Sequence, residues 1–332
     1  MKKRRAELLP PGGVSLSSIF SRRRDASLIA LAALAGLVAG IFAVFTSEMS
    51  PDASASYARA KDLRDAPLAG ATGSRSELIA RIAALGASER LAPPTTVETP
   101  GGSSHPKLIV IFDDMGLDRR AFTEIMTLPG PFTLAFLPYA NNVQPLVDEA
   151  RRRGDEILLH LPMEPSGSAD PGPHSLEAAM RQDKLFDTLE WNLARFDGYA
   201  GVNNHMGSKF TRDEQSMKRV LSLLKQRGLF FVDSLTTSGS AASRAGAAVG
   251  AEVFVRDVFL DAEPGREAVR RQLALAEAIA VKTGYAVVIC HPRRETLDVI
   301  GPWLTTAPAR GIELSTITTL RQMSEKQLAA AP

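Results

Sequence analysis

The feature that most constrains this chain is a regular alternation of short apolar runs and amphipathic stretches that begins at Lys107. Eight apolar runs are typical of short buried strands: Leu108–Phe112, Phe132–Leu137, Ile157–Leu161, Tyr199–Val202, Leu229–Val232, Val253–Val258, Ala286–Cys290 and Ile312–Leu314. The clearest helical periodicity lies between them, at Val143–Arg153, Leu176–Phe196, Glu214–Arg227 and Arg266–Thr283. Strands that alternate with helices predict a parallel sheet. Seven to eight such units favour an α/β fold, a distorted (β/α) barrel over residues 106–332, with a doubly wound sheet as the alternative.

The N-terminal segment is of a different kind. Residues Ala26 to Phe45 carry no charge, and this length crosses the hydrocarbon core of a bilayer as a helix. Arg22, Arg23 and Arg24 come directly before it. The positive-inside rule then makes residues 1–25 a cytoplasmic basic tail and residues 26–46 a single-pass transmembrane anchor in the cytoplasmic membrane. The rest of the chain is expected in the periplasm.

Two alternatives concern this segment. A cleaved signal peptide is possible because Ala53-Ser54-Ala55 resembles a cleavage site, but the apolar run is longer than usual for such a peptide. Gly36 and Gly40 form a small-xxx-small pair, a weak signal for self-association.

Residues 47–105 are rich in Ser, Ala, Pro and Gly, which predicts an extracytoplasmic linker.

Charge and cysteine content exclude several classes of function. Seven of the 39 basic residues and two of the 37 acidic residues lie in the first 25 positions, so the rest of the chain has a net charge of −3. Nucleic acid is therefore not an expected partner. Cys290 is the only cysteine, which rules out an intrachain disulfide and a cysteine-rich zinc site. A metal ion would need histidine, aspartate or glutamate ligands.

Polar residues gather where the predicted strands end, which is where barrels place their chemistry. They are Asp113, Asp114, Tyr139, His160, Glu164, Asn203, Asn204, His205, Asp233, Asp257, Asp261 and His291. Singly, each can also cap a helix or satisfy a buried group. Three of the chain's five histidines are in this set. A carboxylate with two imidazoles suits Zn²⁺, with Co²⁺, Ni²⁺ or Fe²⁺ as alternatives, and leaves a coordination position for water.

Four stretches carry a resemblance to a known family. The segment from Ile109 to Gly116, IVIFDDMG, resembles the opening motif of polysaccharide deacetylases. The segments HLPMEP from His160, NNHMGS from Asn203 and CHP from Cys290 are similar to the divergent branch of this NodB-like carbohydrate esterase superfamily. The resemblance covers Lys107 to Leu320 and implies a distorted (β/α) barrel.

The resemblance also implies roles for single residues. Asp113 matches the catalytic base, Asp114 the metal-binding carboxylate and His291 the general acid. Typical members carry two histidines one helical turn apart after the third strand, whereas this chain has His160 followed by Glu164. We therefore predict His205 as the replacement ligand.

Other members of the set are expected in supporting roles. The arginine that follows the fourth strand in typical members is replaced by Asn203-Asn204-His205. Candidates for supporting the ligands or binding sugar hydroxyls are Glu164, Asn203, Asn204, Tyr139 and Asp233.

Three functions remain open from the sequence. The first is a metal-dependent hydrolase that removes N-acetyl groups from an extracytoplasmic glycan. The second is a catalytically weak or inactive envelope protein that uses the same fold to bind glycan or a membrane partner. The third is another metal-dependent barrel hydrolase, such as a phosphoesterase, which the absence of a Lys/Arg cluster among the strand-end motifs disfavours.

Overall fold

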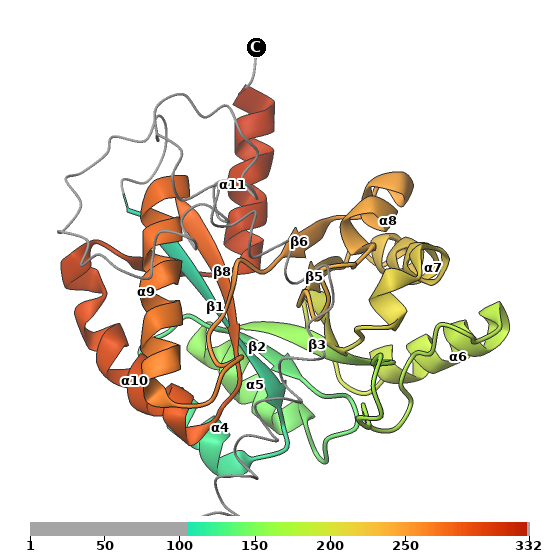
Figure 1. Cartoon of the computed structure of the whole chain (residues 1–332), viewed down its shortest axis with the longest axis horizontal. Coiled ribbons are helices and arrows are strands. Elements are labelled where there is room, and N and C mark those ends of the chain that lie inside the picture. The colour runs from blue at the N-terminus through green and yellow to red at the C-terminus, as the bar shows by residue number, and fades with distance from the viewer. Residues whose placement is uncertain (1–104, 331–332) are drawn as a thin grey trace, which may run out of the picture. The chain divides into compact units, whose positions relative to one another are not determined.

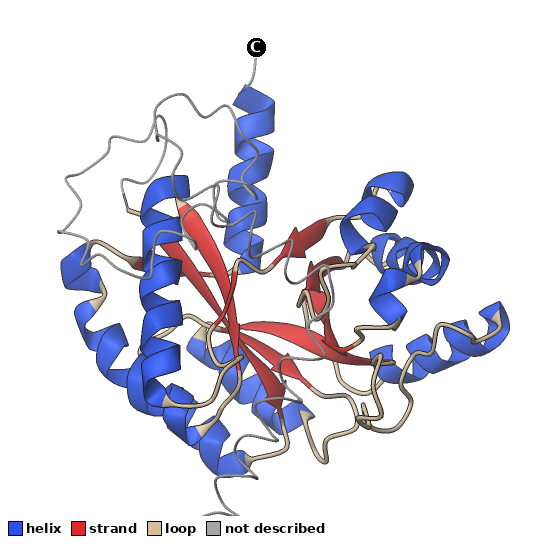
Figure 2. Ribbon diagram, viewed as in Figure 1, coloured by secondary structure: helices blue, strands red, loops and turns tan. Residues whose placement is uncertain are grey.

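A computed structural model describes residues 105–330 of the chain, and these residues form an α/β half-barrel (Figure 1). All pairs in its sheet are parallel, in the order β6-β5-β4-β3-β2-β1-β8-β7, and β9 pairs with the start of β1. Figure 2 shows the strands curving together, with most helices on their outer side. The strands are β1 (Lys107–Met115), β2 (Thr133–Phe136), β3 (Glu156–Met163), β4 (Gly201–Met206), β5 (Phe230–Asp233), β6 (Val253–Val255), β7 (Val258–Phe259), β8 (Tyr285–Cys290) and β9 (Glu313–Ser315).

The helices follow the strands in βα order. They are α4 (Arg119–Thr127), α5 (Gln144–Arg153), α6 (Gln182–Leu193), α7 (Glu214–Gln226), α8 (Ala242–Val249), α9 (Arg266–Thr283), α10 (Arg294–Thr306) and α11 (Ile317–Ala330), with short 3₁₀ turns at Phe210–Arg212 and Pro308–Arg310. Gly154 and Gly284 end α5 and α9 in the left-handed conformation, as their positions in the sequence predict.

The two edges of the sheet are joined by a very short connection. β6 pairs with β5, β7 pairs with β8, and only Arg256 and Asp257 separate β6 from β7 along the chain. Asp257 attaches this connection to β8, because its N–H donates to the Val287 carbonyl and its carboxylate accepts from the Val287 N–H, each at 2.8 Å. The predicted single strand Val253–Val258 is thus divided between two edges, which curls the sheet into a half-barrel.

Each face of the sheet buries its own apolar core. Alternate residues of β1 show this division, since Leu108, Val110 and Phe112 pack in the larger cluster with the helices. Ile109 and Ile111 face the other way and pack with residues of the neighbouring strands and with α11. The second cluster contains Ile109, Ile111, Ala135, Leu158, Phe230, Val232, Val287, Ile289, Ile317 and Leu320.

Helix α11 is anchored at the end of the half-barrel opposite to the strand C-termini. Ile317 and Leu320 are buried in the inner core, and the buried carboxylate of Glu156, at the start of β3, lies 3.1 Å from the Thr318 backbone nitrogen and hydroxyl. The Glu156 carboxylate therefore satisfies donors at the start of this helix.

The structure corrects several predicted boundaries. α6 begins at Gln182 rather than Leu176, because Leu176 forms a bridge with Met163 of β3. β4 begins at Gly201 and runs on to Met206, so Asn203, Asn204 and His205 lie within a strand rather than after it. Helix α4, which the periodicity did not predict, begins where the Asp118 carboxylate accepts from the Arg120 and Ala121 N–H groups.

The predicted tail, anchor and nearly all of the predicted linker lie outside the described residues. Within residues 105–330, no helix is both long and apolar enough to cross a membrane.

Candidate metal centre

The first two residues of the site lie at the end of β1. Asp113 is buried, and Asp114 adopts a left-handed backbone conformation with φ of 57°. Adjacent residues of a strand normally point to opposite faces. The left-handed turn at Asp114 changes this pattern, and both carboxylates reach the same histidine: His160 Nε2 lies 3.7 Å from Asp113 Oδ2 and 3.3 Å from Asp114 Oδ1.

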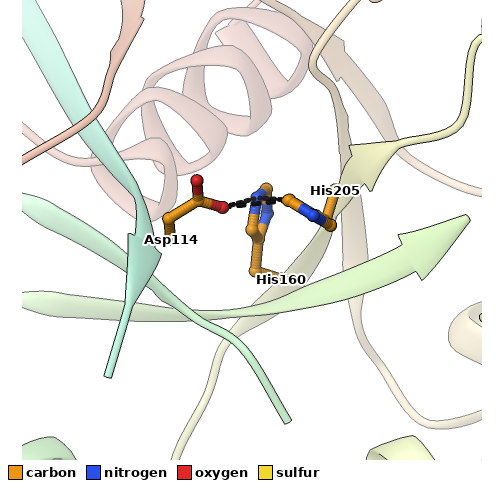
Figure 3. Close-up of side chains that lie close together, drawn as sticks. All are labelled: Asp114, His160 and His205. Atoms are coloured by element: carbon orange, nitrogen blue, oxygen red, sulfur yellow. Dashed lines mark hydrogen bonds and ion pairs between the residues drawn. The ribbon is translucent and has the colours of Figure 1, made fainter. Parts of the chain in front are cut away.

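The two imidazoles come from neighbouring strands. In the β3–β4 register His160 pairs with Asn203 and Pro162 pairs with His205. His205 therefore lies two residue pairs beyond His160 along the strands and on the same side of the sheet, and its Nδ1 reaches to 3.2 Å from His160 Nε2 and 2.9 Å from Asp114 Oδ1. Figure 3 shows the three side chains converging from β1, β3 and β4.

These three atoms fit a small divalent cation. Ligands held tetrahedrally at 2.0–2.1 Å from Zn²⁺ lie about 3.3 Å from one another. The separations of 2.9, 3.2 and 3.3 Å among Asp114 Oδ1, His205 Nδ1 and His160 Nε2 are close to that value. Asp114 Oδ1 is also buried without a partner in hydrogen-bond geometry, so its lone pairs are available to a cation. Asp114, His160 and His205 form a group of possible metal ligands among the described residues.

The charge state of Asp114 suits this role. Burial alone would raise the pKa of Asp114, but its contacts with His160 and His205 outweigh burial and hold that pKa well below its usual range. The carboxyl group is therefore ionised at neutral pH, as a metal ligand must be.

His291, which directly follows β8, lies on another side of Asp114. Its Nε2 is 3.7 Å from Asp114 Oδ2, and its Nδ1 is 3.1 Å from Asp261 Oδ1. Burial disfavours the charged imidazolium, but the hydrogen bond and negative charge of Asp261, together with the charges of Asp113 and Asp114, raise the pKa of His291. The raised pKa favours the protonated form of His291, which can donate a proton.

Asp113 differs from its neighbour in the direction of its pKa shift. Burial raises the pKa of the Asp113 carboxyl, and the charges of His160 and His291 with a hydrogen bond from Asn203 oppose this rise. The site thus holds two adjacent carboxyl groups with opposite pKa shifts, an arrangement found where one group binds charge and the other exchanges a proton.

The sequence profile of divergent polysaccharide deacetylases matches residues 110–321, which include all five residues of this site. The chain belongs to the divergent polysaccharide deacetylase family. Its described fold is a deacetylase-type α/β half-barrel of parallel strands, consistent with the NodB-like barrel.

Two proteins of similar sequence and one solved structure resemble this chain. An uncharacterized protein of Haemophilus influenzae is 33% identical over 218 residues, which cover 64% of this chain and 76% of that protein. The uncharacterized protein YibQ of Escherichia coli is 29% identical over 202 residues, covering 61% of this chain and 63% of YibQ, so the match spans less than two thirds of YibQ. The crystal structure of the uncharacterized protein ATU2773 of Agrobacterium tumefaciens superposes with a TM-score of 0.64 at 29% identity, covering 76% of this chain and 98% of that one.

Tyr139, one of the predicted supporting residues, is influenced by the negative charge of the site. It is half-buried, and burial together with the negative charges of Asp114 and Asp170 raises the pKa of Tyr139 to about 12. Its ring lies against Gly172, where an added Cβ would be only 2.7 Å away. Tyr139 is therefore a neutral hydroxyl beside the site.

Glu164 is engaged elsewhere. One of its carboxylate oxygens pairs with Lys209 Nζ at 2.5 Å, and the other accepts from the Ala178 N–H at 3.0 Å. The Glu164 backbone carbonyl also accepts from the Lys209 and Phe210 N–H groups. The structure thus places this side chain between two loops and not with the three candidate ligands.

Asn204 and Asp233 brace the ends of β4 and β5. The Asn204 side chain accepts from the Ser234 N–H at 2.8 Å and donates to the Met206 carbonyl at 2.7 Å. Asp233 accepts from the Leu235 N–H at 2.9 Å. These contacts hold the loop beyond β5 in place, and no direct contact with the candidate ligands accompanies them.

Asp261 is the residue that sequence reasoning left without a role. It stands among the strand-end carboxylates, but its partner His291 is 30 positions away. The pairing arises because β7 and β8 are adjacent, which places the residues that follow them side by side. The signal in the sequence that points to Asp261 is an acidic residue that follows one strand when the adjacent strand is followed by the catalytic histidine.

Proposed function

We propose that the protein is a metal-dependent hydrolase that removes N-acetyl groups from a glycan. The observation that carries the proposal is the convergence of Asp114, His160 and His205 with Asp113 and His291 beside them. Asp114, His160 and His205 would hold the ion. A carboxylate with two imidazoles favours Zn²⁺, and Co²⁺, Ni²⁺ and Fe²⁺ are the alternatives. When bound, the ion would supply Lewis-acid polarisation of the acetamide carbonyl and a more acidic water molecule.

Asp113 is the proposed general base. Its Oδ1 accepts a hydrogen bond from Asn203 at 2.7 Å, and its Oδ2 lies toward the candidate ligands, 3.7 Å from His160 Nε2. Oδ2 is then the oxygen that takes the proton from the attacking water. Burial raises the pKa of Asp113, and a more basic carboxylate takes up a proton more readily.

His291 is the proposed general acid. Its Nδ1 faces Asp261, which leaves the Nε2 proton directed toward the centre of the site. An amide nitrogen leaves poorly unless it is protonated, and His291 Nε2–H would deliver this proton as the carbon–nitrogen bond breaks. Tyr139 supports the proposal as a neutral hydroxyl that a sugar could contact.

The proposed setting follows from the sequence. The apolar span at residues 26–46 would anchor the chain in the cytoplasmic membrane, with residues 1–25 in the cytoplasm and the deacetylase domain in the periplasm. An N-acetylated glycan of the cell envelope would then be the substrate class. Self-association through Gly36 and Gly40 is a further, weaker part of this proposal.

One observation favours a second candidate, an envelope protein that binds glycan with little or no catalysis. Glu164 stands where typical members have their second histidine, and its carboxylate is engaged with Lys209 and Ala178. The ligand set then depends on His205, which comes from the next strand.

Acetate release separates the two candidates. The full-length chain would be loaded with Zn²⁺, its metal content measured, and the sample incubated with N-acetylglucosamine oligomers from chitin and peptidoglycan. Metal-dependent acetate release supports the hydrolase. Binding of Zn²⁺ and glycan without acetate release supports the envelope-binding alternative.

A further inference from the structure

Asn203 joins the proposed base to one of the proposed ligands. Its side chain is fully buried on β4, with the amide nitrogen 2.7 Å from Asp113 Oδ1 and the amide oxygen 2.8 Å from His160 Nδ1. The same nitrogen lies 3.4 Å from the Ser234 hydroxyl. One amide group therefore connects β1, β3 and β4 inside the half-barrel.

We propose that Asn203 is a positioning residue with two separate tasks, and this inference rests on the proposed function. At its oxygen end it fixes His160 as the tautomer with the proton on Nδ1, so that Nε2 presents a lone pair to the metal position. At its nitrogen end it occupies Oδ1 of Asp113 and leaves Oδ2 as the oxygen that takes the proton.

The chemistry of Asp113 sets the direction of the amide. The Asn203 NH₂ group lies 2.7 Å from Asp113 Oδ1 and donates to it, and a carboxylate that acts as the general base can only accept hydrogen bonds. The carbonyl oxygen then faces His160, and a carbonyl oxygen only accepts, so His160 Nδ1 must carry the proton. The other ring nitrogen, Nε2, is the atom 3.3 Å from Asp114 Oδ1 and 3.2 Å from His205 Nδ1.

The backbone register keeps this contact in place. His160 and Asn203 are direct partners in the β3–β4 pairing, and both side chains are buried. Water is excluded, so an amide or imidazole that lost its partner here would leave a buried polar group unsatisfied. The alternative His160 tautomer, with Nδ1 as acceptor, would do this at the Asn203 oxygen.

Two substitutions separate the two tasks. Asn203→Leu has a similar shape and removes both contacts. Asn203→Asp retains an oxygen that accepts from His160 Nδ1–H, but it sets a carboxylate against Asp113 where an NH₂ group donates in the wild type. Asn203→Leu should therefore weaken metal binding and slow the chemical step, whereas Asn203→Asp should slow the chemical step alone.

The readouts are Zn²⁺ affinity, the His160 tautomer and the steady-state constants, all on the full-length chain. Loss of a group that orients a metal-binding histidine typically costs about 10–100-fold in affinity, which is the rise in Kd expected for Asn203→Leu. For Asn203→Asp the Zn²⁺ Kd should stay within about threefold of wild type, well below that loss. Its kcat should fall by about 10²-fold or more at little changed KM, since general bases contribute about 10²–10⁴.

The tautomer is measured directly in metal-free protein labelled with ¹⁵N-histidine, where only five side chains give signals. At alkaline pH wild-type His160, assigned with a His160→Gln variant, should show its proton on Nδ1. In Asn203→Leu the proton should move to Nε2 or divide between both nitrogens. Asn192→Leu is the matched control, because Asn192 is a buried asparagine of α6 that bonds to the backbone carbonyls of His174 and Thr188. It should leave the His160 signals unchanged.

The inference and the proposed function fail in different ways. A wild-type His160 that carries its proton on Nε2 overturns the inference even if no variant folds. Unchanged Zn²⁺ affinity and tautomer in a folded Asn203→Leu variant overturn it as well. The third outcome is a wild-type chain that has the Nδ1–H tautomer and releases no acetate, with Zn²⁺ affinity that falls on Asn203→Leu. This outcome supports the inference about Asn203 and contradicts the proposed function.

Discussion

Asp261 binds His291 at two points. One carboxylate oxygen accepts the His291 backbone N–H at 2.9 Å, and the other lies 3.1 Å from the ring nitrogen Nδ1. The first oxygen also accepts from the Thr296 hydroxyl at 2.8 Å, so the carboxylate is itself held in place. Backbone and ring of His291 are thus fixed together, which directs Nε2 toward Asp114.

The pKa of His291 should fall when Asp261 is replaced by Asn. The substitution removes the hydrogen bond and charge that raise this pKa and leaves the burial that lowers it. An NMR pH titration of the ¹⁵N-histidine-labelled chain measures the shift. In the hydrolase, the alkaline limb of the kcat/KM profile should move to lower pH with it. An unchanged His291 pKa would remove Asp261 from its assigned role.

The stabilisation that the Asp261–His291 pair contributes to the folded state should depend on pH in a defined direction. The folded-state pKa of His291 is raised above the value of 6.5, so its contribution is fully present below pH 6.5 and is lost as pH rises through the raised pKa. The pKa of Asp261 is lowered from 3.8, so its contribution is lost in acid. Asp261→Asn should therefore be most destabilising between about pH 4 and pH 6.5, and less so at pH 9, in urea unfolding. An equal cost at both pH values contradicts this.

Metal occupancy should depend on three side chains. Asp114→Ala, His160→Ala and His205→Ala each remove one of the three converging donor atoms and should lower bound Zn²⁺ sharply, as measured by elemental analysis after gel filtration. His174→Ala is the control, because His174 is exposed and stacks on Trp191 with ring centroids 3.5 Å apart. Equal occupancy in all four variants would remove the assignment of the ligands.

Catalysis should be lost without loss of metal in two other variants. Asp113→Asn and His291→Ala remove the proposed base and acid, which are typically worth about 10²–10⁴ in rate. Acetate release from an N-acetylglucosamine oligomer should fall by that factor, with Zn²⁺ and glycan binding near wild type. Variants that match an active wild type would leave the fold in place and remove the mechanism.

Stability should also depend on the anchor of α11. Glu156→Ala removes the carboxylate beside the Thr318 N–H and hydroxyl and leaves these partly buried donors without their acceptor, which costs about 1–3 kcal/mol. Urea unfolding measures the loss, and hydrogen exchange should rise first at the start of α11. Glu263→Ala, which removes an exposed ion pair with Arg271, is the control and should change stability by less than about 0.5 kcal/mol. A Glu156→Ala variant as stable as this control would show that the contact is not an anchor.

Topology is tested by a reporter. Because Arg22–Arg24 precede the apolar span, an enzyme active only outside the cytoplasm should work when fused after Pro332. The matched fusion to a reporter active only in the cytoplasm should be silent. The opposite pattern would reverse the predicted orientation.

Local pattern was sufficient to predict most of the fold. Parallel strands that are buried on both faces are largely apolar, so the centre of β1 and most of β8 are visible as continuous apolar runs, and in β3 the run is interrupted by His160. Helix α9 was predicted to the residue because its periodicity runs unbroken from Arg266 to the capping Gly284. Helix α4 was missed because it is short and depends on the Asp118 cap more than on a long apolar stripe.

What the sequence by itself determined is therefore the βαβ order and the set of polar residues at the strand ends. The strand period and the rule that parallel strands end at one edge are local properties that a single chain reveals. Asp114, His160 and His205 were identified as candidate ligands on this basis, with the family resemblance, and the structure brings them together.

The tertiary structure alone decided which polar residues touch. Asn203 faces Asp113 and His160 because the β3–β4 register places it there, and a shift of one residue would have turned it to the other face of the sheet. Glu164, four positions after His160, lies between two loops. Its partners Lys209 and Ala178 are distant in the sequence, so the local pattern does not reveal its surroundings. Contacts such as that of Asp261 with His291 depend on strand pairing across the half-barrel, and no periodicity along the chain encodes a partner 30 residues away.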